Sequence, residues 1–352
     1  MKCDVLIIGA GPAGSSAACV AAEKGLKVVV VECRPVVGVP VRCAEYIPGP
    51  LLGEVNLGID FVEQSVKGMR TILPDGSVKE MKAPGYMIHR DRFDQALAKA
   101  AGDAGAQFFL STTARAREGG NVRVREEGGR DFTISADVII GADGPFSRVG
   151  RWIGASNRNL IPAAQVRVNL TRPMEFTEVY FDRNIQGGYG WVFPKGRAAN
   201  VGIGVKKGMG ISGSVTRTLD YFLARLNEQG VITGKPFQSF AGWIPAGPIE
   251  KTVHENILLA GDAAGHTHPI TGAGVFTAVK AGRMAGRWAS EAIEKGDLKL
   301  LNEYETEWQE FFGTTLARAY KRRQFLEKEW DRLDEIIRDC WVAFREYYAE
   351  PA

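Results

Sequence analysis

Short apolar runs separated by turn residues mark the beginning of the chain. Residues 4–32, DVLIIGAGPAGSSAACVAAEKGLKVVVVE, start with an apolar run, pass through a glycine-rich turn into an alanine-rich stretch, and end in a run of valines. Continuous apolar runs are typical of strands buried on both faces of a parallel sheet, and alanine favours helix. This order predicts a strand, a helix and a second strand, which is the start of an α/β fold.

Two later segments show the same change from strand to turn to helix. Residues 136–154, ADVIIGADGPFSRVGRWIG, contain an apolar strand, a tight Asp-Gly turn at 143–144 and a helix start. Residues 255–282, ENILLAGDAAGHTHPITGAGVFTAVKAG, contain a strand that ends in the Gly-Asp pair at 261–262, a loop with further glycines, and a long helix from about Val275. Each segment alone fits an ordinary connection, but their order along one chain indicates a shared nucleotide-binding architecture.

Alternating apolar and polar residues dominate the middle of the chain. Between residues 165 and 245 the runs QVRVNL, TEVYF, YGWVFP, ANVGIGV and FAGWIP predict strands, interrupted by one helix near 215–228. Residues 65–82 predict a hairpin around the Asp-Gly turn at 75–76, and residues 119–136 a smaller hairpin in the first domain. The alternating region therefore predicts an antiparallel sheet with a helix, which is a common floor for a substrate site.

The pattern becomes helical from Asp297 onward. Apolar side chains recur there at steps of three and four residues, which predicts helices with one aromatic face. Such a face usually packs on the rest of the protein, but a partner or a membrane surface stays open as an alternative. The side chains of this face are Tyr304, Trp308, Phe311, Phe312, Leu316, Tyr320, Leu326, Trp330, Leu333, Ile337, Trp341 and Phe344.

These patterns predict one discontinuous α/β domain, a second domain inserted into it, and a helical C-terminal segment. The predicted ranges are 1–64, 83–161 and 250–296 for the first domain, 65–82 and 162–249 for the antiparallel-sheet α+β domain, and 297–352 for the helical segment.

Composition and charge narrow the class of protein. With 45% hydrophobic and 24% charged residues, the chain of 352 residues reads as a soluble globular protein. A net charge of +3 gives no case for nucleic-acid binding. The five cysteines include no CxxC pair and have no histidine cluster beside them, so we expect no disulfide framework, no metal site and a reducing cytoplasm. No apolar run approaches the roughly 20 residues of a membrane crossing, so any membrane contact is expected to be peripheral.

The glycines of the first turn have the spacing of a dinucleotide site. Gly9 permits a tight turn, Gly11 lets the backbone approach a pyrophosphate, and Gly14 lets helix and strand pack closely. The helix N-terminus favours the phosphate charge. Glu32 ends the second strand, 21 residues after Gly11, where a carboxylate accepts hydrogen bonds from a ribose.

The segment around Asp262 predicts that the nucleotide is a flavin. A carboxylate at the end of a strand is suited to a ribityl hydroxyl. The TGAG backbone at 271–274 and the dipole of the following helix would stabilise negative charge on a reduced flavin ring.

The stretch GGYGWVFPKG, residues 187–196, concentrates three aromatic residues in one predicted strand. Alternation places Tyr189, Trp191 and Phe193 on the same face. They form either part of a core or the wall of a site for an apolar molecule, which binds through buried area. Residues 187 and 188 are glycines, which would let the backbone approach a ligand.

Together these segments resemble the flavoprotein class that includes aromatic hydroxylases, flavin halogenases, electron-transfer-flavoprotein quinone reductases and geranylgeranyl reductases. The resemblance is closest to the geranylgeranyl reductases and runs through most of the chain. Residues 39–52, VPVRCAEYIPGPLL, resemble that family's loop with a cysteine near the flavin, and residues 139–152, IIGADGPFSRVGRW, resemble another of its motifs. The stretch GGYGWVFPKG, together with the residue before it, is similar to the family's PxxYxWxFP element. Gln186 stands where the element has its first proline, which predicts a looser turn.

The resemblance implies FAD as the cofactor and a Rossmann-like FAD-binding domain of the glutathione-reductase type. Residues 86–101 also resemble the class, in which a strand delivers an arginine just before a helix; a surface salt bridge is the alternative role for this arginine. The implied cofactor-binding residues are Gly9, Gly11, Ala13, Gly14, Glu32, Cys33, Arg90, Asp143, Gly144, Gly261, Asp262, Gly272, Ala273 and Gly274.

The implied reaction is reduction of isolated C=C bonds of geranylgeranyl chains by hydride from reduced FAD. An unconjugated alkene accepts hydride poorly, so a proton must accompany it, and Cys43, Glu45, Tyr189 and water are the candidate sources. Cys43 could equally be a small buried residue without a chemical role. The predicted catalytic residues are Cys43, Tyr189 and Glu45, and the predicted substrate-binding residues are Gly187, Gly188, Tyr189, Trp191, Phe193 and Pro194.

Two other functions share the same scaffold. A flavin monooxygenase or halogenase would act on an apolar substrate with O₂, and a flavoprotein could pass electrons to a quinone. The quinone function would need an iron-sulfur module, for which the sequence has no cysteine set.

The sequence has one dinucleotide motif and no second nucleotide-binding βαβ unit. We therefore expect a transient electron donor, either NAD(P)H or a ferredoxin-like protein. The other expected partner is the isoprenoid lipid substrate, in a cytoplasmic protein that could contact the membrane at its surface.

Overall fold

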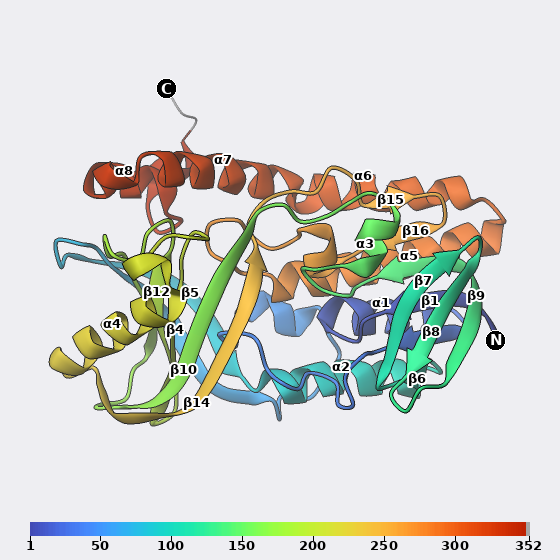
Figure 1. Ribbon diagram of the computed structural model, residues 1–352, viewed down its shortest axis with the longest axis horizontal. Helices are drawn as coiled ribbons and strands as arrows, with labels where there is room; N and C mark the ends of the chain where they lie inside the picture. The colour runs from blue at the N-terminus through green and yellow to red at the C-terminus, as the bar shows by residue number, and fades with distance from the viewer. Residues whose placement is uncertain (350–352) are drawn as a thin grey trace.

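Two β-sheets lie at opposite ends of an elongated molecule in the computed structural model, which describes residues 1–349 (Figure 1). The first sheet has the strand order β15-β16-β9-β1-β2-β6, with β7 and β8 forming a hairpin layer beside β9. Its central strands pair in parallel and are buried, as the apolar runs predict. The strands are β1 (Lys2–Ile8), β2 (Val28–Val31), β6 (Gln107–Phe109), β7 (Thr112–Glu118), β8 (Asn121–Glu126), β9 (Asp131–Gly141), β15 (Val253–His254) and β16 (Ile257–Leu259).

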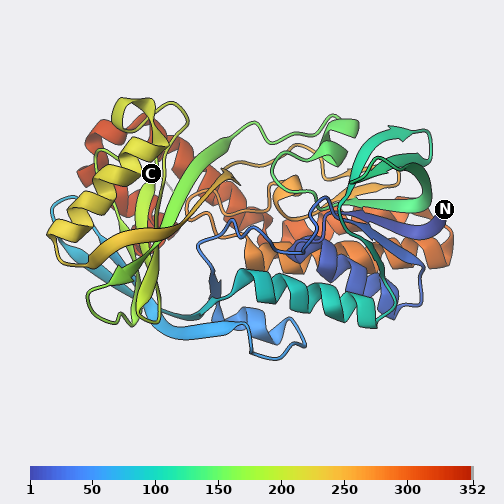
Figure 2. The same ribbon diagram turned by 60° about the horizontal axis from the view of Figure 1, so that its bottom comes forward.

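Helix α1 (Pro12–Glu23) lies between α2 (Arg90–Asp103) and α5 (Val275–Lys295), and Figure 2 shows the three helices side by side. Small residues make this close packing possible. A Cβ added at Gly282 or Gly286 of α5 would collide with the backbone of α1 at Ala13 or Ala17. The two helices are therefore in backbone contact, which joins residues near 15 to residues near 285.

The second sheet has the strand order β14-β10-β13-β12-β11-β4-β5-β3. Most pairs are antiparallel as predicted, but β11 pairs with β4 in parallel, so the sheet is mixed. The connection between these strands is long, and the sequence pattern contains no signal for the direction of pairing. The strands are β3 (Tyr46–Pro48), β4 (Val62–Ile72), β5 (Val78–Ile88), β10 (Leu160–Leu170), β11 (Phe176–Tyr180), β12 (Tyr189–Lys195), β13 (Ala198–Gly204) and β14 (Ile232–Pro245).

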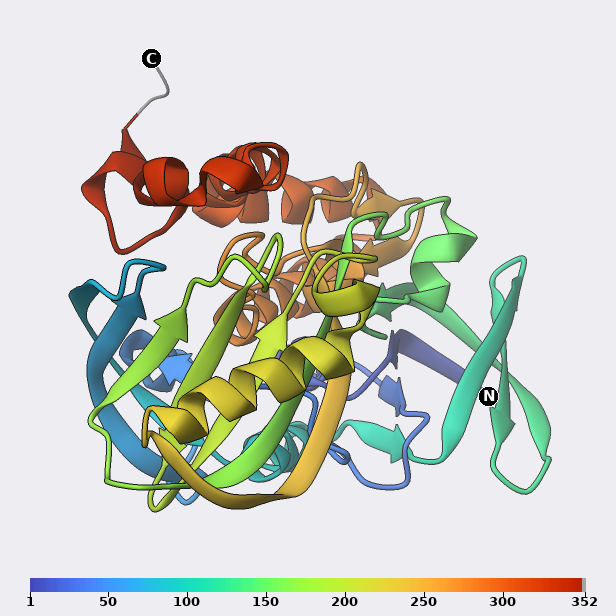
Figure 3. The same cartoon turned by 60° about the vertical axis from the view of Figure 1, so that its left-hand side comes forward.

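The predicted hairpins at 65–82 and 119–136 and the predicted helix near 215–228 are confirmed. Helix α4 (Val215–Glu228) crosses one face of the second sheet (Figure 3). Phe222 of α4 fills the space over Gly190 of β12, where a side chain would clash. β3, the first residues of β4 and the last residues of β5 belong to the second sheet, although the predicted ranges place them in the first domain. The division into domains remains a prediction.

The C-terminal helices lie along one side of the molecule, from the first sheet to the second (Figure 1). Most of their aromatic face packs on the protein, as the spacing indicates, but Phe311, a predicted member of this face, is 52% exposed. The predicted helical pattern is wrong at Trp341 and Phe344, because the last helix ends at Cys340; both side chains are buried in an irregular segment. The last three residues of the predicted segment lie outside the described residues. The elements are α6 (Asn302–Trp308), a π-helical turn (Gln309–Gly313), α7 (Thr314–Lys328) and α8 (Leu333–Cys340).

Short helical elements complete the chain. They are η1 (Gly49–Gly53), α3 (Arg148–Trp152), η2 (Ile211–Gly213), η3 (Gly261–Ala264), η4 (Leu298–Leu301), η6 (Trp330–Arg332) and η7 (Arg345–Tyr348).

Candidate functional site

The glycine-rich turn between β1 and α1 has the shape of a phosphate cradle. Gly9 has a φ of +104°, and a Cβ added at Gly14 would collide with the carbonyl oxygen of Gly9. A Cβ at Gly11 would meet nothing within 4 Å, so the space at the N-terminus of α1 is open. An open space beside the positive end of a helix suits a pyrophosphate, and these residues fit FAD.

The Glu32 carboxylate is fixed beside this turn. One oxygen accepts the backbone N–H of Ala10 at 2.8 Å, and the other accepts that of Arg34 at 3.0 Å. Cys33, which is exposed, places its Sγ 3.4 Å from the same carboxylate. The carboxylate is thus held in one orientation at the end of β2, as a ribose contact requires.

Two of the other predicted cofactor residues also carry structural roles. Ala13 is buried in α1, where its backbone and side chain contact the glycines of α5 and of the 261–262 turn. Asp143 accepts the N–H groups of Arg148 at 2.6 Å and Val149 at 3.2 Å, so its carboxylate satisfies the start of α3. Gly144 has a φ of +79° and open space around it.

Asp262 lies at the end of β16 beside the 271–274 loop. Its Oδ1 accepts the hydroxyl of Thr267 at 2.7 Å and lies 3.6 Å from the position of a Cβ built on Gly274. Burial raises the pKa of the Asp262 carboxyl, while the Thr267 hydrogen bond and the charge of Arg90 act in the opposite direction. The charge of Arg90 therefore acts on the Asp262 carboxyl, although 172 residues separate the two in the chain.

Arg90 is half-buried, and its ion pair partner Asp94 is buried, so the pair is not a fully exposed surface salt bridge. Its guanidinium pairs with Asp94 at 2.9 Å, and the two side chains are 14% and 6% exposed. Burial opposes the charged form, but the pKa of Arg90 is raised by Asp94 and by Cys43. The backbone N–H of Arg90 also donates to the Glu45 carboxylate at 3.0 Å. Arg90 therefore lies between the Asp262 region and the cysteine loop.

The cysteine loop forms a tight turn at residues 43–45. Glu45 has a φ of +69°, a region that a non-glycine residue occupies at a cost of about 1–3 kcal/mol. Its backbone N–H donates to the Cys43 Sγ at 3.2 Å. Cys43 itself is half-buried, and its thiol is held by the turn.

The Glu45 carboxylate is buried among cations from the second sheet. Oε2 accepts from Lys195 at 2.8 Å and from Arg167 at 2.6 Å. Burial would raise the pKa of Glu45, but Lys195, the Arg90 N–H and Asn200 outweigh it and hold the pKa below its ordinary value. Glu45 is therefore an ionised anchor and a poor proton donor near neutral pH.

The aromatic strand meets the 271–274 loop at Tyr189. The Tyr189 hydroxyl donates to the carbonyl of Thr271 and lies 3.7 Å from the position of a Cβ on Gly272. The Tyr189 ring also packs edge-on against Trp191 and Trp341, with centroids 6.1 and 5.3 Å away. Burial raises the pKa of the Tyr189 phenol, which stays protonated. β12 and the 271–274 loop therefore lie next to each other.

Two hydrogen bonds of Gln186 restrain the turn before Tyr189. The carbonyl of Gln186 accepts from Lys206 N at 2.9 Å, and its side chain accepts from Gly210 N at 3.3 Å. The two following glycines pack against the protein itself: a Cβ at Gly187 would press on Lys206, and one at Gly188 would collide with a carbonyl of β13. The side chain and carbonyl of Gln186 therefore restrain the turn in place of the family's proline.

Family models match two parts of the chain. Residues 161–236 match a model described as geranylgeranyl reductase catalytic domain, and residues 4–172 match one described as lycopene cyclase protein. A digeranylgeranylglycerophospholipid reductase from Methanothrix thermoacetophila is 38% identical, over 92% of this chain and 88% of that protein. The protein of the same name from Methanocaldococcus jannaschii is 35% identical, over 95% and 90%.

The chain belongs to the digeranylgeranylglycerophospholipid reductase family. It is an FAD-dependent oxidoreductase, so the predicted resemblance, enzyme class and cofactor are confirmed.

Solved structures agree with this family at the level of the fold. A geranylgeranyl bacteriochlorophyll reductase-like protein from Thermoplasma acidophilum superposes with a TM-score of 0.84 at 31% identity, covering 95% of this chain and 92% of that one. A probable FAD-dependent monooxygenase from Pseudomonas aeruginosa has a TM-score of 0.70 at 17% identity, covering 96% and 100%. The second likeness shows the fold alone, and the predicted fold class is confirmed.

Four polar residues that hold the cysteine loop of this family member were not predicted. They come from β10, β12 and β13 and contact residues more than 100 positions away in the chain. Lys195 had a usable signal, because a lysine directly after the YxWxFP element ends an otherwise apolar strand. The four residues are Gln165, Arg167, Lys195 and Asn200.

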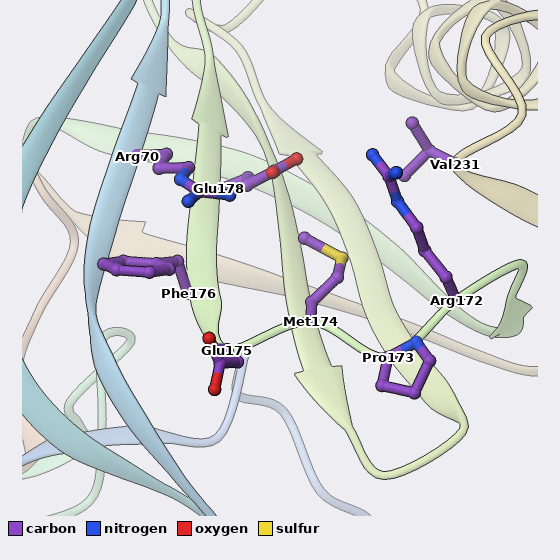
Figure 4. Close-up of a pocket in the computed structure, with 8 residues that line it drawn as sticks. All are labelled: Arg70, Arg172, Pro173, Met174, Glu175, Phe176, Glu178 and Val231. Atoms are coloured by element: carbon purple, nitrogen blue, oxygen red, sulfur yellow. The ribbon is translucent and has the colours of Figure 1, made fainter.

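A surface pocket of about 290 Å³ lies elsewhere, near the 172–176 segment (Figure 4). Arg70 stacks over the ring of Phe176 at 4.3 Å and pairs with Glu80 at 3.1 Å. None of the residues predicted for the cofactor or the substrate lines this pocket. The pocket therefore lies apart from the residues predicted for the site.

Two histidines just before the 271–274 loop, buried His266 and half-buried His268, predict how stability depends on pH. Burial lowers the pKa of His266 to about 3 and that of His268 to about 4. Both stay neutral in the folded protein, whereas in the unfolded chain they take up protons below a pKa of about 6.5. Stability is therefore complete above pH 6.5 and falls as the pH drops toward 4, by about 2 kcal/mol for each histidine between pH 7 and 5.

Urea unfolding between pH 5 and 7 measures this dependence. The His266→Leu variant should lose about half of the histidine contribution, which flattens the slope of unfolding free energy against pH. An unchanged slope would show that His266 is protonated in the folded state.

Proposed function

We propose that the protein saturates isolated C=C bonds of geranylgeranyl chains carried by a lipid. The observation that carries this proposal is the contact between Tyr189 and Thr271, which joins the aromatic strand to the loop predicted to hold the flavin. The names of the relatives support the substrate class. An apolar wall beside a flavin loop brings an alkene within reach of the cofactor.

FAD, when bound, supplies the hydride that goes to one carbon of the alkene. In the proposal the residues of the glycine turn hold its pyrophosphate, Glu32 its ribose, and Asp262 its ribityl chain. The open space at Gly11 and the oriented Glu32 carboxylate support these roles.

The isoprenoid chain is proposed to lie along the aromatic face of β12. Tyr189 and Phe193 are half-buried there, beside a buried cluster that includes side chains of the C-terminal segment. An isoprenoid has no polar groups along its length, so binding must come from apolar area, at about 25 cal/mol per Å². Rigid aromatic rings provide that area at little cost in side-chain entropy.

Cys43 is the proposed source of the proton that goes to the second carbon. Glu45 is held ionised by its cations, and the Tyr189 hydroxyl is committed to Thr271. The thiol is half-buried and lies beside Arg90, which would stabilise the thiolate left after the transfer. The Cys43→Ser and Cys43→Ala variants should keep FAD but lose at least about 100-fold in kcat, the usual range for a general acid. Full activity in either variant would remove Cys43 from the mechanism.

Electrons are proposed to arrive from NAD(P)H or a ferredoxin-like protein that binds transiently. Within residues 1–349 the first sheet carries one dinucleotide turn, which the cofactor would occupy. The lipid substrate is proposed to be reached by peripheral contact with a membrane. Phe146 and Trp243, 54% and 37% exposed, pack edge to face at 5.9 Å and would suit such a surface. No helix in the described part of the chain is long and apolar enough to span a bilayer.

Anaerobic flavin reoxidation tests the proposed function. The FAD-loaded protein is reduced with dithionite under argon and mixed with a geranylgeranyl lipid, and the flavin absorbance near 450 nm is followed. Return of the oxidised spectrum together with a partly saturated lipid, seen by mass spectrometry, is the expected result. A fully saturated lipid of the same head group is the control. Reoxidation only by O₂, with an oxygenated or halogenated product, would instead support a monooxygenase or halogenase.

A further inference from the structure

Side chains of the second sheet bind each residue of the turn at 43–45. Gln165 donates to the carbonyl of Cys43 at 2.8 Å. Asn200 donates to the carbonyl of Ala44 at 3.1 Å and to the Glu45 carboxylate at 2.8 Å. These bonds therefore restrain the turn relative to β10 and β13.

The Glu45–Lys195 ion pair is the buried centre of this arrangement. The two side chains are 2% and 3% exposed, and Lys195 also donates to the carbonyl of Ile88 at 2.9 Å. Burying such a pair costs about as much desolvation energy as its attraction returns, so apolar residues could provide equal stability. What the charged pair adds is a fixed geometry, since the carboxylate accepts only from correctly placed donors.

The conformation of Glu45 sets the position of the thiol. The left-handed backbone of Glu45 directs its N–H to the Cys43 Sγ. A non-glycine residue keeps this conformation only where its surroundings impose it. The Lys195 ammonium, together with Arg167 and Asn200, holds the Glu45 carboxylate and so imposes this conformation. A change at Lys195 therefore reaches Cys43 through Glu45, without a direct contact between the lysine and the cysteine.

Trp191 acts on the same turn through a second route. Its indole Nε1–H donates to the Oε1 of Gln165 at 3.2 Å, which orients the amide so that its NH₂ meets the Cys43 carbonyl. Trp191 is only 6% exposed, so most of its ring is covered by the protein. The tryptophan of the aromatic strand is therefore connected to the cysteine turn as well as to the apolar wall.

We propose that Lys195 is a positioning residue that holds the Cys43 thiol in place through Glu45, and that Trp191 does the same through Gln165. The effect of this positioning on catalysis rests on the proposed function, whereas the restraint on the thiol can be tested without it.

Thiol alkylation in the Lys195→Met variant tests the restraint. The full-length, FAD-loaded protein is treated with iodoacetamide, and alkylation of each cysteine is followed by peptide mass spectrometry. Release of the turn should make Cys43 react about tenfold faster, because a freed loop exposes its thiol more often. Half-buried Cys19 of α1, which is not among the predicted cofactor or substrate residues, should react at its original rate and serves as the internal reference.

Matched variants separate this effect from general damage. Lys67→Met removes another lysine of the second sheet, paired with Glu175 at 2.7 Å on the exposed surface, and should leave Cys43 unchanged. Lys195→Arg keeps the charge and should restore part of the protection. If Lys195→Met fails to retain FAD, the Glu45→Gln/Lys195→Met double variant, which carries no buried charge at these two positions, should show the same faster alkylation.

An unchanged Cys43 rate in FAD-loaded Lys195→Met overturns the proposal. So does loss of the fold in both the single and the double variant, because the pair would then serve the whole fold. For Trp191, Trp191→Phe keeps the ring and removes the donor, and it should accelerate Cys43 alkylation by about threefold or more.

Steady-state kinetics add the catalytic readout. A positioning role lowers kcat by about tenfold or more in Lys195→Met while KM for the lipid stays within about twofold. If the natural protein reduces no geranylgeranyl lipid, the proposed function fails, but the alkylation rates still decide the positioning role.

Discussion

Replacing Gly14 with alanine is expected to give a colourless protein that binds FAD at least about 100-fold more weakly. The added Cβ would collide with the Gly9 carbonyl oxygen and lie 3.2 Å from the Ala142 side chain. Backbone atoms cannot move aside as a flexible side chain can, so α1 must shift away from β1. Overpacking of this kind costs about 1–3 kcal/mol, and a shifted α1 also loses the orientation that its N-terminus needs to bind phosphate. Flavin titration followed by protein fluorescence, together with thermal unfolding, measures both effects.

Two other glycines make this experiment specific. Gly11→Ala meets no protein atom within 4 Å, so the apoprotein should unfold as the natural one does, but FAD should bind weakly because the Cβ occupies the cradle. Gly102→Ala, in α2 with open space around it, should keep FAD and gain up to about 1 kcal/mol. A yellow Gly14→Ala protein with normal affinity would contradict the close packing of α1 on the turn.

Replacing Arg323 with methionine is expected to lower the free energy of unfolding by about 3 kcal/mol. This arginine of α7 is 5% exposed and donates to the Gly187 carbonyl at 2.8 Å and the Pro269 carbonyl at 3.2 Å. Methionine fills much of the space but leaves both carbonyls without a donor. Because one carbonyl precedes Tyr189 and the other precedes the 271–274 loop, KM for the lipid should also rise by about tenfold.

Urea unfolding and steady-state kinetics measure the two consequences. Lys328→Met is the matched control, because this lysine of the same helix is 80% exposed. It should change stability by less than about 0.5 kcal/mol. An Arg323→Met protein with normal stability and normal KM would show that α7 does not hold the two walls of the site together.

Local sequence signals were sufficient for most of the fold. The glycine turn, its flanking strands and Glu32 lie within 30 residues, so their spacing alone determines how they meet. The same is true of β12, whose alternation places Tyr189 and Phe193 on one face. Predictions of this kind rest on the periodicity of apolar residues within one segment, which does not depend on the rest of the chain.

The anchor of the cysteine turn could not be predicted, because it joins residues that only the sheet brings together. Arg167 and Asn200 are separated from Glu45 by 122 and 155 positions. A single charged residue in a strand usually faces water, and nothing local shows that these point to a buried carboxylate. The predicted proton donor Glu45 thus has an ionic environment that the sequence did not reveal.

The helical periodicity also gave a wrong prediction near the end of the chain. Trp341 and Phe344 continue the three- and four-residue steps of α8, but the helix ends at Cys340. Trp341 instead donates its indole N–H to Thr71 at 2.7 Å and packs on Tyr189. A buried tryptophan needs a partner for its N–H, and tertiary contacts outweighed local propensity.

The strand orders of the two sheets have a consequence for the newly made chain. All strands of the second sheet are present once residue 245 has emerged from the ribosome. The first sheet still lacks β16, Asp262 and α5, whose glycines contact α1. Because domains fold as units during synthesis, the second sheet can assemble while the first is still incomplete. We therefore expect FAD to bind late, only after α5 has packed against α1.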